Sequence, residues 1–250
     1  MQNNLSILLI AHNEEPSINQ MIEGLLKNYD KEILEIVVVD DASNDRTAAF
    51  VESQGIRNKK VRLVRRTPPC GVGRALKTGF EHIDPKATYA LSMDSDFVEN
   101  INQVRFLIKA IEEQGYDGVI GSRFIKGGQL VNYPALKKIM NRLFHILVKT
   151  LFFIKQKDLS NNFKLYKTSI FKDIPWHSQD FGMNAETGLL PILAGYRIGE
   201  VPVRWVGRSS GMGQSKFSLF KSGLSYVSVI FYALWFSMTR KSFSKPKTTS

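Results

Sequence analysis

The sequence predicts an α/β domain whose mostly parallel sheet is covered by helices on both faces, followed by C-terminal membrane-associating helices. Two observations in the first half support this fold class. Short runs of apolar residues recur, and segments of helical periodicity separate them. Continuous apolar runs are typical of strands buried on both faces, and their alternation with helices favours parallel pairing. A chain of 250 residues, of which 43% are apolar and 23% charged, can bury such a core.

The expected elements alternate in order along this first half. The apolar runs that read as strands are residues 5–11, 36–39, 61–64, 89–93 and 119–120. The spacing of apolar residues predicts helices over residues 18–26, 45–54, 72–83 and 103–114. Because ligands of open parallel sheets bind beyond the carboxyl ends of the strands, the residues that follow these runs are the first candidates for a site.

The charge of the chain is unevenly distributed. The net charge is +11, yet there is no acidic residue between Asp117 and Asp158 and none after Glu200. Such a field suits anionic partners: nucleoside diphosphates, lipid phosphates, a membrane surface or nucleic acid. The single cysteine, Cys70, cannot form an internal disulfide, and the first residues offer no secretory signal. We therefore expect the catalytic part to face the cytoplasm.

A helix expected over residues 136–154 carries Lys138, Arg142, His145 and Lys149 as one narrow basic stripe beside a broad apolar face. This pattern predicts a helix lying in a membrane interface, and we place His145 in the stripe rather than in a catalytic pair. The alternative is a helix that packs on the core and has a solvated edge.

Residues 222–239 carry no charge and precede a basic tail. The stretch is at the lower edge of the roughly 20 residues that span a bilayer, so we favour a helix lying on or dipping into the membrane over a lone span. The expected organisation is a catalytic domain over 1–218, a membrane-associated helix over 219–241 and a basic polar tail over 242–250.

Two carboxylates in Asp94-Ser95-Asp96 follow the strand expected at 89–93. Carboxylates separated by one residue at a strand end can both be directed at one Mg²⁺ or Mn²⁺, which takes oxygen ligands and bridges to substrate phosphates. The alternative is a solvated turn.

Two further strand ends carry polar residues on the same predicted edge. Asp40 and Asp41 could accept hydrogen bonds from a base or a ribose, or they could cap the helix expected from Asp45. His12 and Glu14 follow the first strand. No single structural role, such as a solvated turn or a helix cap, explains the polar residues at all three strand ends.

The motifs resemble those of a known family. In order along the first half they are S-I-L-L-I-A-H-N-E-E-P, V-V-V-D-D-A-S-N-D-R-T, G-V-G-R-A-L-K-T-G-F and M-D-S-D. They resemble family 2 glycosyltransferases, whose Rossmann-like, nucleotide-sugar-binding fold is of the GT-A type. Later segments, among them G-S-R-F, D-L-S-N-N-F-K-L-Y and E-V-P-V, resemble the dolichyl- and polyprenyl-phosphate sugar transferases within that family.

The resemblance implies roles for particular residues. The nucleotide-sugar would be held by residues 1–125, through Ala11, His12, Glu14, Asp40, Asp41, Asp94 and Ser95. The metal would be held by Asp94 and Asp96, and Arg123 would lie by the phosphates at the reaction centre. Residues 126–218 would hold the acceptor, with its phosphate on Arg208, Ser215 and Lys216.

Two departures from the family pattern affect these assignments. Val98 stands where the family usually carries Gln in its acidic motif. The spacing from Arg208 to Ser215 and Lys216 is stretched, which makes Arg208 the less secure of the three. A degenerate, inactive homologue therefore stays among the alternatives, although Asp94 and Asp96 are both present.

We therefore predict a metal-dependent hexosyltransferase acting on polyprenyl or dolichyl phosphate at the cytoplasmic face of a membrane, with Asp96, Arg123 and Glu186 as the catalytic candidates. A phosphate monoester has a second pKa of about 6 and is a ready nucleophile, whereas a hydroxyl acceptor needs a base. Glu186 is the best candidate base in the second half, or else a residue of a helix start. Inversion of the anomeric centre is what the resemblance implies.

Other functions compete with this one. The runner-up is a family 2 glycosyltransferase acting on a hydroxyl, either of a saccharide in cell-surface polysaccharide synthesis or of a protein. A nucleotidyltransferase is disfavoured because His12-Asn13-Glu14-Glu15 stands where a Gly-rich basic loop is expected. A nucleic-acid-binding protein is disfavoured because the bases accompany apolar helices rather than stacking aromatics. A membrane-protein partner and a homo-oligomer are both left open.

Overall fold

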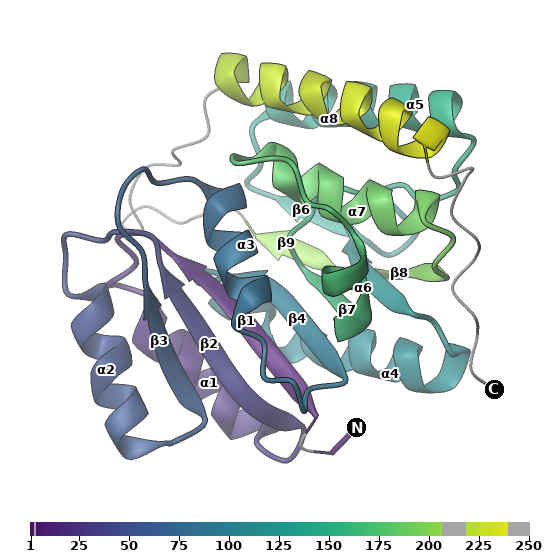
Figure 1. Ribbon diagram of the computed structural model, residues 1–250. Coiled ribbons are helices and arrows are strands. Elements are labelled where there is room, and N and C mark those ends of the chain that lie inside the picture. Colours follow the sequence, from purple (N-terminus) through teal and green to yellow (C-terminus); the bar gives the residue numbers. More distant parts are fainter. Residues whose placement is uncertain (3, 207–218, 240–250) are drawn as a thin grey trace.

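The computed structural model describes residues 1–2, 4–206 and 219–239, and its core is a seven-stranded sheet in the order β3-β2-β1-β4-β7-β5-β8 (Figure 1). The strands are β1 (Leu5–Ala11), β2 (Ile33–Asp40), β3 (Val61–Arg65), β4 (Tyr89–Asp94), β5 (Gly118–Ser122), β7 (Lys164–Lys167) and β8 (Ile198–Pro202). Of these, β7 alone is antiparallel to its neighbours, β4 and β5. The sheet is therefore mixed but mostly parallel, as predicted.

Helices cover both faces of this sheet. One face is covered by α1 (Ile18–Tyr29), α2 (Thr47–Arg57), the 3-10 helix η1 (Val98–Gln103) and α4 (Val104–Gln114). The other face is covered by α3 (Val72–Glu81), α6 (Thr168–Asp173) and α7 (Gly182–Leu193). Strand β1 shows why both layers are needed: Ile7 and Leu9 pack into the first core and Leu8 into the second, so both faces of the strand are apolar.

Two long helices form an outer layer beyond α7. They are α5 (Ala135–Phe152) and α8 (Leu219–Thr239), which lie side by side at the top of Figure 1. Helix α8 packs on α7, with Val229, Ala233 and Phe236 buried. A short parallel pair, β6 (Gln129–Val131) and β9 (Arg204–Val206), lies beside the main sheet.

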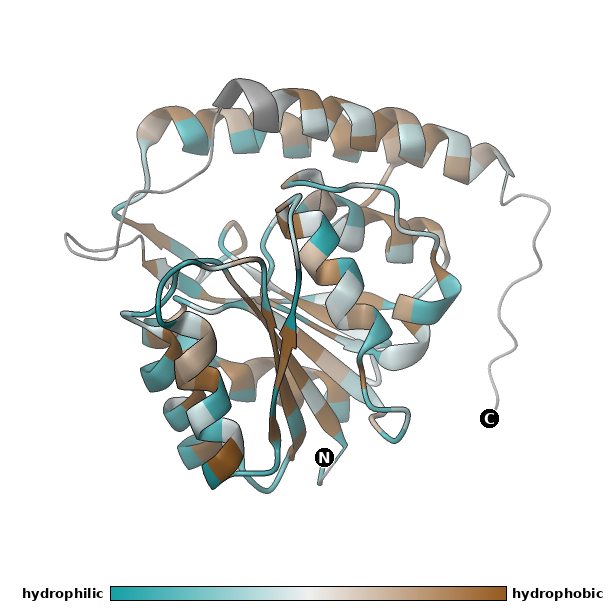
Figure 2. Cartoon of the chain, turned by 60° about the vertical axis from the view of Figure 1, so that its left-hand side comes forward, coloured by the Kyte–Doolittle hydropathy of each residue, from teal (hydrophilic) through white to brown (hydrophobic). Residues whose placement is uncertain are grey.

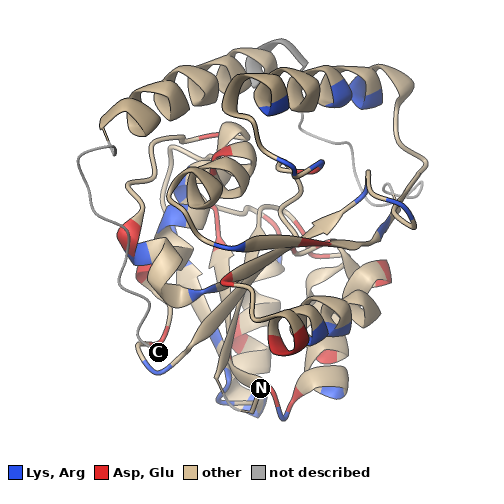
Figure 3. Ribbon diagram, turned by 90° about the vertical axis from the view of Figure 1, so that its right-hand side faces the viewer, with Lys and Arg blue, Asp and Glu red and all other residues tan. Residues whose placement is uncertain are grey.

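The outer surface of α5 and α8 is apolar and basic. Figure 2 shows hydrophobic residues along both helices, and Figure 3 shows Lys and Arg on α5 but no acidic residue on either helix. The exposed apolar side chains are Leu136, Ile139, Met140, Leu143, Ile146, Leu147 and Leu151 on α5, and Leu224, Val227, Phe231, Trp235 and Met238 on α8. Within the described ranges, we find no helix that combines the length and apolarity needed to cross a membrane.

One residue of the predicted basic stripe lies elsewhere, which corrects that expectation. His145 is only 4% exposed, because it faces the domain instead of the outer surface. Its Nδ1–H donates to the main-chain carbonyl of Asn141 (2.7 Å), and its Nε2 accepts the N–H of Leu159 (2.7 Å). Burial lowers the pKa of His145. A neutral ring with both nitrogens occupied can neither meet a headgroup nor transfer a proton.

Candidate active site

A cavity of about 940 Å³ lies beyond the carboxyl ends of β1 and β4, where the topology of the sheet predicts a ligand. Its polar end is lined by His12, Asn13, Glu14, Asp41, Asp94, Ser95, Asp96, Glu99, Arg123, Asn161 and Asn162. Its other end is lined by Met140, Leu143, Phe144 and Leu147 of α5 and by Tyr226, Val227 and Ile230 of α8. The cavity therefore joins an acidic, polar site to an apolar one.

The acidic triplet enters this cavity as the sequence predicts. Asp94 is the last residue of β4, and both Asp94 and Asp96 are half-buried and line the cavity. Between them, the hydroxyl of Ser95 donates to the main-chain carbonyl of Ile10 (2.8 Å), which ties the turn to β1. This anchoring fixes the turn from which both carboxylates project.

These carboxylates fit a divalent cation of the Mg²⁺ or Mn²⁺ type. Two carboxylates together with the phosphates of a substrate are the usual donor set for such ions. Neither His nor Cys joins them: across the described part of the chain, no three His, Cys, Asp and Glu side chains gather in a way that could hold a metal. Val98, at the start of η1, packs against the core and supplies no oxygen.

The two adjacent acids at the end of β2, Asp40 and Asp41, differ in their access to the cavity. Asp41 lines the cavity, where it accepts the N–H of Gly71 (2.7 Å) and pairs with Arg66. Asp40 is fully buried behind it, and its carboxylate accepts the N–H of Ser43 (3.2 Å). The expectation that both acids would hold the nucleoside is therefore corrected, because the described cavity lining includes Asp41 and not Asp40.

The loop after β1 places His12 and Glu14 against the same cavity. The Nδ1–H of His12 donates to the main-chain carbonyl of Asp41 (2.6 Å), so the hydrogen bond fixes the orientation of the ring and leaves Nε2 for a ligand. Ala11 lies within β1 and is fully buried, with its carbonyl accepting the N–H of Asp41 (2.8 Å). It supports the wall of the cavity without lining it.

Sequence reasoning did not find the rigid joint between the loops after β1 and β2. Asn13 donates its N–H to the hydroxyl of Ser43 (2.9 Å), and its side-chain oxygen accepts the N–H of Asn44 (2.9 Å). Asn13 and Ala42 both have φ of 57°, a left-handed conformation that costs a non-glycine residue about 1–2 kcal/mol. Such strain persists where surrounding bonds enforce it, and it gathers at functional sites.

Arg123 lines the cavity but is paired with Asp158. Its Nε–H donates to Asp158 Oδ2 (2.7 Å), and its Nη2 donates to Asp158 Oδ1 (2.8 Å) and to the hydroxyl of Ser160 (3.1 Å). Burial disfavours both charges, but the mutual attraction outweighs it, so the pKa of Arg123 is raised and that of Asp158 lowered. These bonds hold the guanidinium in one orientation.

The structure does not bring Glu186 into the cavity, and this corrects its assignment as a base. Glu186 is fully buried within α7. Its carboxylate accepts the N–H of His177, the N–H of Ser178 (2.8 Å) and the hydroxyl of Ser178. These bonds hold the loop before α7, and Glu186 is absent from the described cavity lining.

The segment between α5 and β7 supplies site residues that the sequence motif alone did not single out. Asn161 donates from Nδ2 to the carbonyl of Gly121 (2.6 Å), and Asn162 donates from Nδ2 to Asp94 Oδ1 (2.9 Å). Their position depends on Gly188, because a side chain there would collide with the carbonyl of Leu159. A polar run next to the buried strand β7 was the available signal.

The remaining predicted site residues, Arg208, Ser215 and Lys216, lie outside the described ranges.

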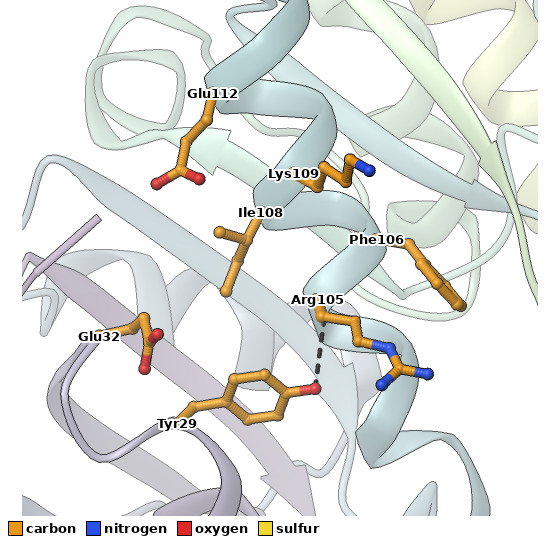
Figure 4. Close-up of a pocket in the computed structure, with 7 residues that line it drawn as sticks. All are labelled: Tyr29, Glu32, Arg105, Phe106, Ile108, Lys109 and Glu112. Carbon is orange, nitrogen blue, oxygen red and sulfur yellow. Dashed lines mark hydrogen bonds between the residues drawn. The ribbon is translucent and has the colours of Figure 1, made fainter.

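A second hollow, of about 410 Å³, lies between α1 and α4, away from the carboxyl edge of the sheet (Figure 4). There the hydroxyl of Tyr29 donates to the carbonyl of Ile101 (2.8 Å) and accepts the N–H of Arg105 (3.3 Å). These bonds join α1 to η1 and α4, and none of the predicted site residues lines this hollow.

With the site described, comparison with known proteins identifies the family. Residues 6–175 match the family described as Glycosyl transferase family 2. The chain belongs to this family. It is 27% identical over 188 residues to the undecaprenyl-phosphate mannosyltransferase of Micrococcus luteus, a match covering 74% of this chain and 76% of that protein. It is 27% identical over 219 residues to the dolichyl-phosphate hexose transferase of Haloferax volcanii, covering 88% of this chain and 89% of that protein.

A solved structure supports the fold of this family 2 glycosyltransferase. The chain is similar to glucosyl-3-phosphoglycerate synthase from Mycobacterium tuberculosis in complex with Mn²⁺ and UDP-glucose, with a TM-score of 0.68 and 18% sequence identity. The superposition covers 94% of this chain and 79% of that one. At this identity the likeness establishes the GT-A-like fold.

Proposed function

We propose that this family 2 glycosyltransferase moves a hexose from a GDP- or UDP-linked sugar to a polyprenyl or dolichyl phosphate at the cytoplasmic face of a membrane, with inversion of the anomeric centre. The observation that carries the proposal is the cavity itself, which has carboxylates at one end and apolar side chains of α5 and α8 at the other. The first end suits a nucleotide-sugar and the second an isoprenoid chain. The names of the relatives from M. luteus and H. volcanii agree with this reading.

The donor would lie along the carboxyl edge of the sheet. Asp41 and His12 would bind the nucleoside, since a carboxylate and an imidazole nitrogen can accept hydrogen bonds from ribose hydroxyls or base N–H groups. Asp94 and Asp96 would hold the Mg²⁺ or Mn²⁺. The bound ion would neutralise negative charge that develops on the diphosphate leaving group.

The proposed reaction needs little proton chemistry. An oxygen of the acceptor phosphate forms a bond to the anomeric carbon while the bond to the nucleoside diphosphate breaks, and the bonding electron pair leaves with the diphosphate. A phosphate monoester with a second pKa of about 6 is mostly a dianion at neutral pH, so no strong base is required. Arg123, oriented by Asp158, would direct its remaining N–H groups at the phosphates.

The acceptor would enter between α5 and α8. Met140, Leu143 and Leu147 line the cavity and are also exposed, so the apolar end continues onto the outer surface. Lys138, Arg142 and Lys149 of α5 would meet anionic headgroups beside it. By the family resemblance, Arg208, Ser215 and Lys216 would hold the acceptor phosphate.

One observation favours the alternative, transfer to a saccharide hydroxyl. Such an acceptor needs a carboxylate base, and Glu99 is exposed and lines the polar end of the cavity. The apolar lining from α5 and α8 would then have no ligand to meet. We therefore keep the lipid phosphate as the proposed acceptor.

The test is transfer of radiolabel into lipid. Purified protein in detergent would be incubated with Mn²⁺, a panel of GDP- and UDP-hexoses and undecaprenyl or dolichyl phosphate. Label in the organic phase from one donor, reduced by about 100-fold or more in Asp96→Ala, supports the proposal. Release of nucleoside diphosphate with saccharide acceptors but without lipid label would support the alternative. The anomeric configuration of the product, measured by NMR, tests inversion.

Membrane docking has its own test. Ile146 on α5 and Phe231 on α8 are 62% and 69% exposed, and neither lines the cavity. Replacing both with Asp should reduce co-sedimentation with anionic vesicles by about 10-fold or more, because each buried apolar side chain contributes roughly 1.5–3 kcal/mol. Ile56→Asp is the matched control, since Ile56 is equally apolar, 78% exposed and on α2. If Ile56→Asp reduces co-sedimentation as much as the double variant on α5 and α8 does, docking through these two helices is contradicted.

A further inference from the structure

The cation site described above has two carboxylates from one turn, and a third oxygen lies next to them. Five side-chain atoms in the described ranges are buried without a hydrogen-bond partner: Asn4 Oδ1, Asp40 Oδ2, Ser122 Oγ, Asn162 Oδ1 and Asn184 Oδ1. Two of these, on Asn162 and Asn184, belong to residues that line the cavity. A buried acceptor without a donor is unfavourable, so such an atom on a residue that lines a cavity points to a ligand that supplies the missing interaction.

Asn162 differs from Asn184 in its contact with the acidic triplet. Its Nδ2 donates to Asp94 Oδ1 (2.9 Å), a direction fixed by chemistry because a carboxylate can only accept. The assignment of the other amide atom follows: Oδ1, bonded to the same carbon, is the unpaired one. An electron-rich oxygen therefore lies beside the Asp94 carboxylate with no donor in the described ranges.

The surroundings hold Asn162 in this place. The hydroxyl of Ser92 on β4 donates to the main-chain carbonyl of Asn162 (2.9 Å), and the side chain of the neighbouring Asn161 is tied to Gly121 on β5. Asn162 is only 3% exposed. A carboxamide fixed between two strands is pre-organised for a ligand and does not need to be ordered when the ligand binds.

We propose that Asn162 Oδ1 is the third protein oxygen of the divalent-cation site formed by Asp94 and Asp96. The inference rests on the proposed function, because it assigns a ligand to the same cation. Mg²⁺ and Mn²⁺ bind carboxylate and amide oxygens, and a cation would satisfy the unpaired acceptor while the Nδ2–H keeps Asp94 oriented. Asn162 thus makes up for the absence of an oxygen-bearing side chain at Val98.

The experiment measures cation binding directly, apart from turnover. Mn²⁺ is titrated into the full-length protein in detergent at pH 8, with GDP or UDP present, and free Mn²⁺ is followed by electron paramagnetic resonance. Asn162→Ala should weaken Mn²⁺ binding by about 10- to 100-fold. Asn162→Asp, which keeps an oxygen but loses the N–H, should bind Mn²⁺ within about threefold of wild type or more tightly.

The variants separate ligation from orientation of Asp94. Equal weakening by Asn162→Asp and Asn162→Ala would overturn the proposal, because only the lost N–H would then matter. Asn184→Ala is the matched control, with the same side chain and the same unpaired oxygen but no bond to the triplet, and it should stay within about twofold of wild type. A loss in Asn184→Ala as large as in Asn162→Ala would also overturn the proposal.

The failure of this inference can be told apart from failure of the proposed function. If wild type and Asn162→Ala bind Mn²⁺ equally while Asp96→Ala does not bind it, the third ligand is refuted and the cation site stands. If wild type itself binds no Mn²⁺ with either nucleotide, both the inference and the metal-dependent part of the proposed function fail. Thermal unfolding of each variant checks folding, and Asn162→Ser, too short to reach the cation, replaces Asn162→Ala if the latter is unfolded.

Discussion

Replacing Asp158 with Asn removes the negative charge that compensates the buried Arg123. Asp158 is fully buried and accepts three N–H groups of Arg123, from the main chain (2.9 Å), Nε (2.7 Å) and Nη2 (2.8 Å). An Asn carboxamide keeps one acceptor oxygen. Its NH₂ group must then face a guanidinium group that has only N–H groups to offer.

The expected loss of stability follows from the burial of both partners. Breaking a buried ion pair by neutralising one side costs about 3–5 kcal/mol, because the other charge is left without compensation. A chain of this size loses roughly 2–4 °C of melting temperature per kcal/mol, so Asp158→Asn should melt about 6–20 °C below wild type. Ser160→Ala removes a neutral acceptor from the same charged guanidinium and should cost less, about 1.5–3 kcal/mol.

Urea unfolding followed by circular dichroism measures both variants. The double variant Arg123→Met, Asp158→Asn should recover part of the loss, because it removes the charge left unpaired by the single change. If Asp158→Asn costs no more than Ser160→Ala, the ion pair contributes nothing beyond a neutral hydrogen bond. The account of Arg123 as a rigid, charge-compensated guanidinium would then be refuted.

The remaining predictions concern two other buried ionisable residues. Burial lowers the pKa of Lys164 to about 7. The unfolded chain, with an ordinary lysine pKa of about 10.4, binds this proton more readily than the folded chain, so the free energy of unfolding should rise between about pH 7 and pH 10 by up to roughly 1.4 kcal/mol per pH unit. Urea titrations at several pH values should show this rise in wild type and its absence in Lys164→Met. Glu186→Gln should cost about 1–3 kcal/mol, because one of its N–H donors loses an acceptor, and it should leave the donor KM within about twofold. A large fall in kcat with unchanged melting temperature would instead restore Glu186 as a base.

The layered fold could be predicted because its signal is local. The strands expected at residues 5–11, 36–39, 61–64, 89–93 and 119–120 are all present, since an apolar run flanked by helices has few other ways to be buried. Strand β7 could not be predicted in the same way. Its sequence K-L-Y-K begins with Lys164, which is buried against main-chain and hydroxyl acceptors on α7, and a lysine at that position argues against a central strand.

Candidate site residues that directly follow a strand could be predicted from the sequence. Those that depend on contacts between distant parts of the chain could not. Asp94, Asp96, His12 and Glu14 line the cavity because the carboxyl ends of β1 and β4 lie side by side. Whether Asp40 or Asp41 lines the cavity depends on the alternation of side chains along the chain. Adjacent residues point to opposite sides, and the sequence does not say which side faces the cavity.

Two corrections have the same origin in long-range contacts. His145 has the spacing of a basic stripe, but it meets the N–H of Leu159, 14 residues away. Glu186 has the position of a catalytic acid near a helix start, but it meets the amides of the loop before α7. In both cases a buried main-chain group required a partner, and no periodicity in the sequence encodes that requirement.

Helices α5 and α8 contribute apolar side chains both to the cavity and to the outer surface. Under the proposed function, this arrangement explains how a cavity of about 940 Å³ could accept the end of a long isoprenoid. Met140, Leu143 and Leu147 line the cavity and are also exposed, so the apolar end of the cavity and the outer surface of α5 share these side chains. The cavity needs to bind only the phosphate and the first part of the chain, and the remainder can stay in the bilayer on which these helices would rest. Removing the whole isoprenoid from the membrane would be unfavourable, whereas sliding its end into a contiguous apolar groove leaves little extra apolar area in water. The arrangement accounts for why the exposed apolar residues gather on the two helices that also complete the cavity.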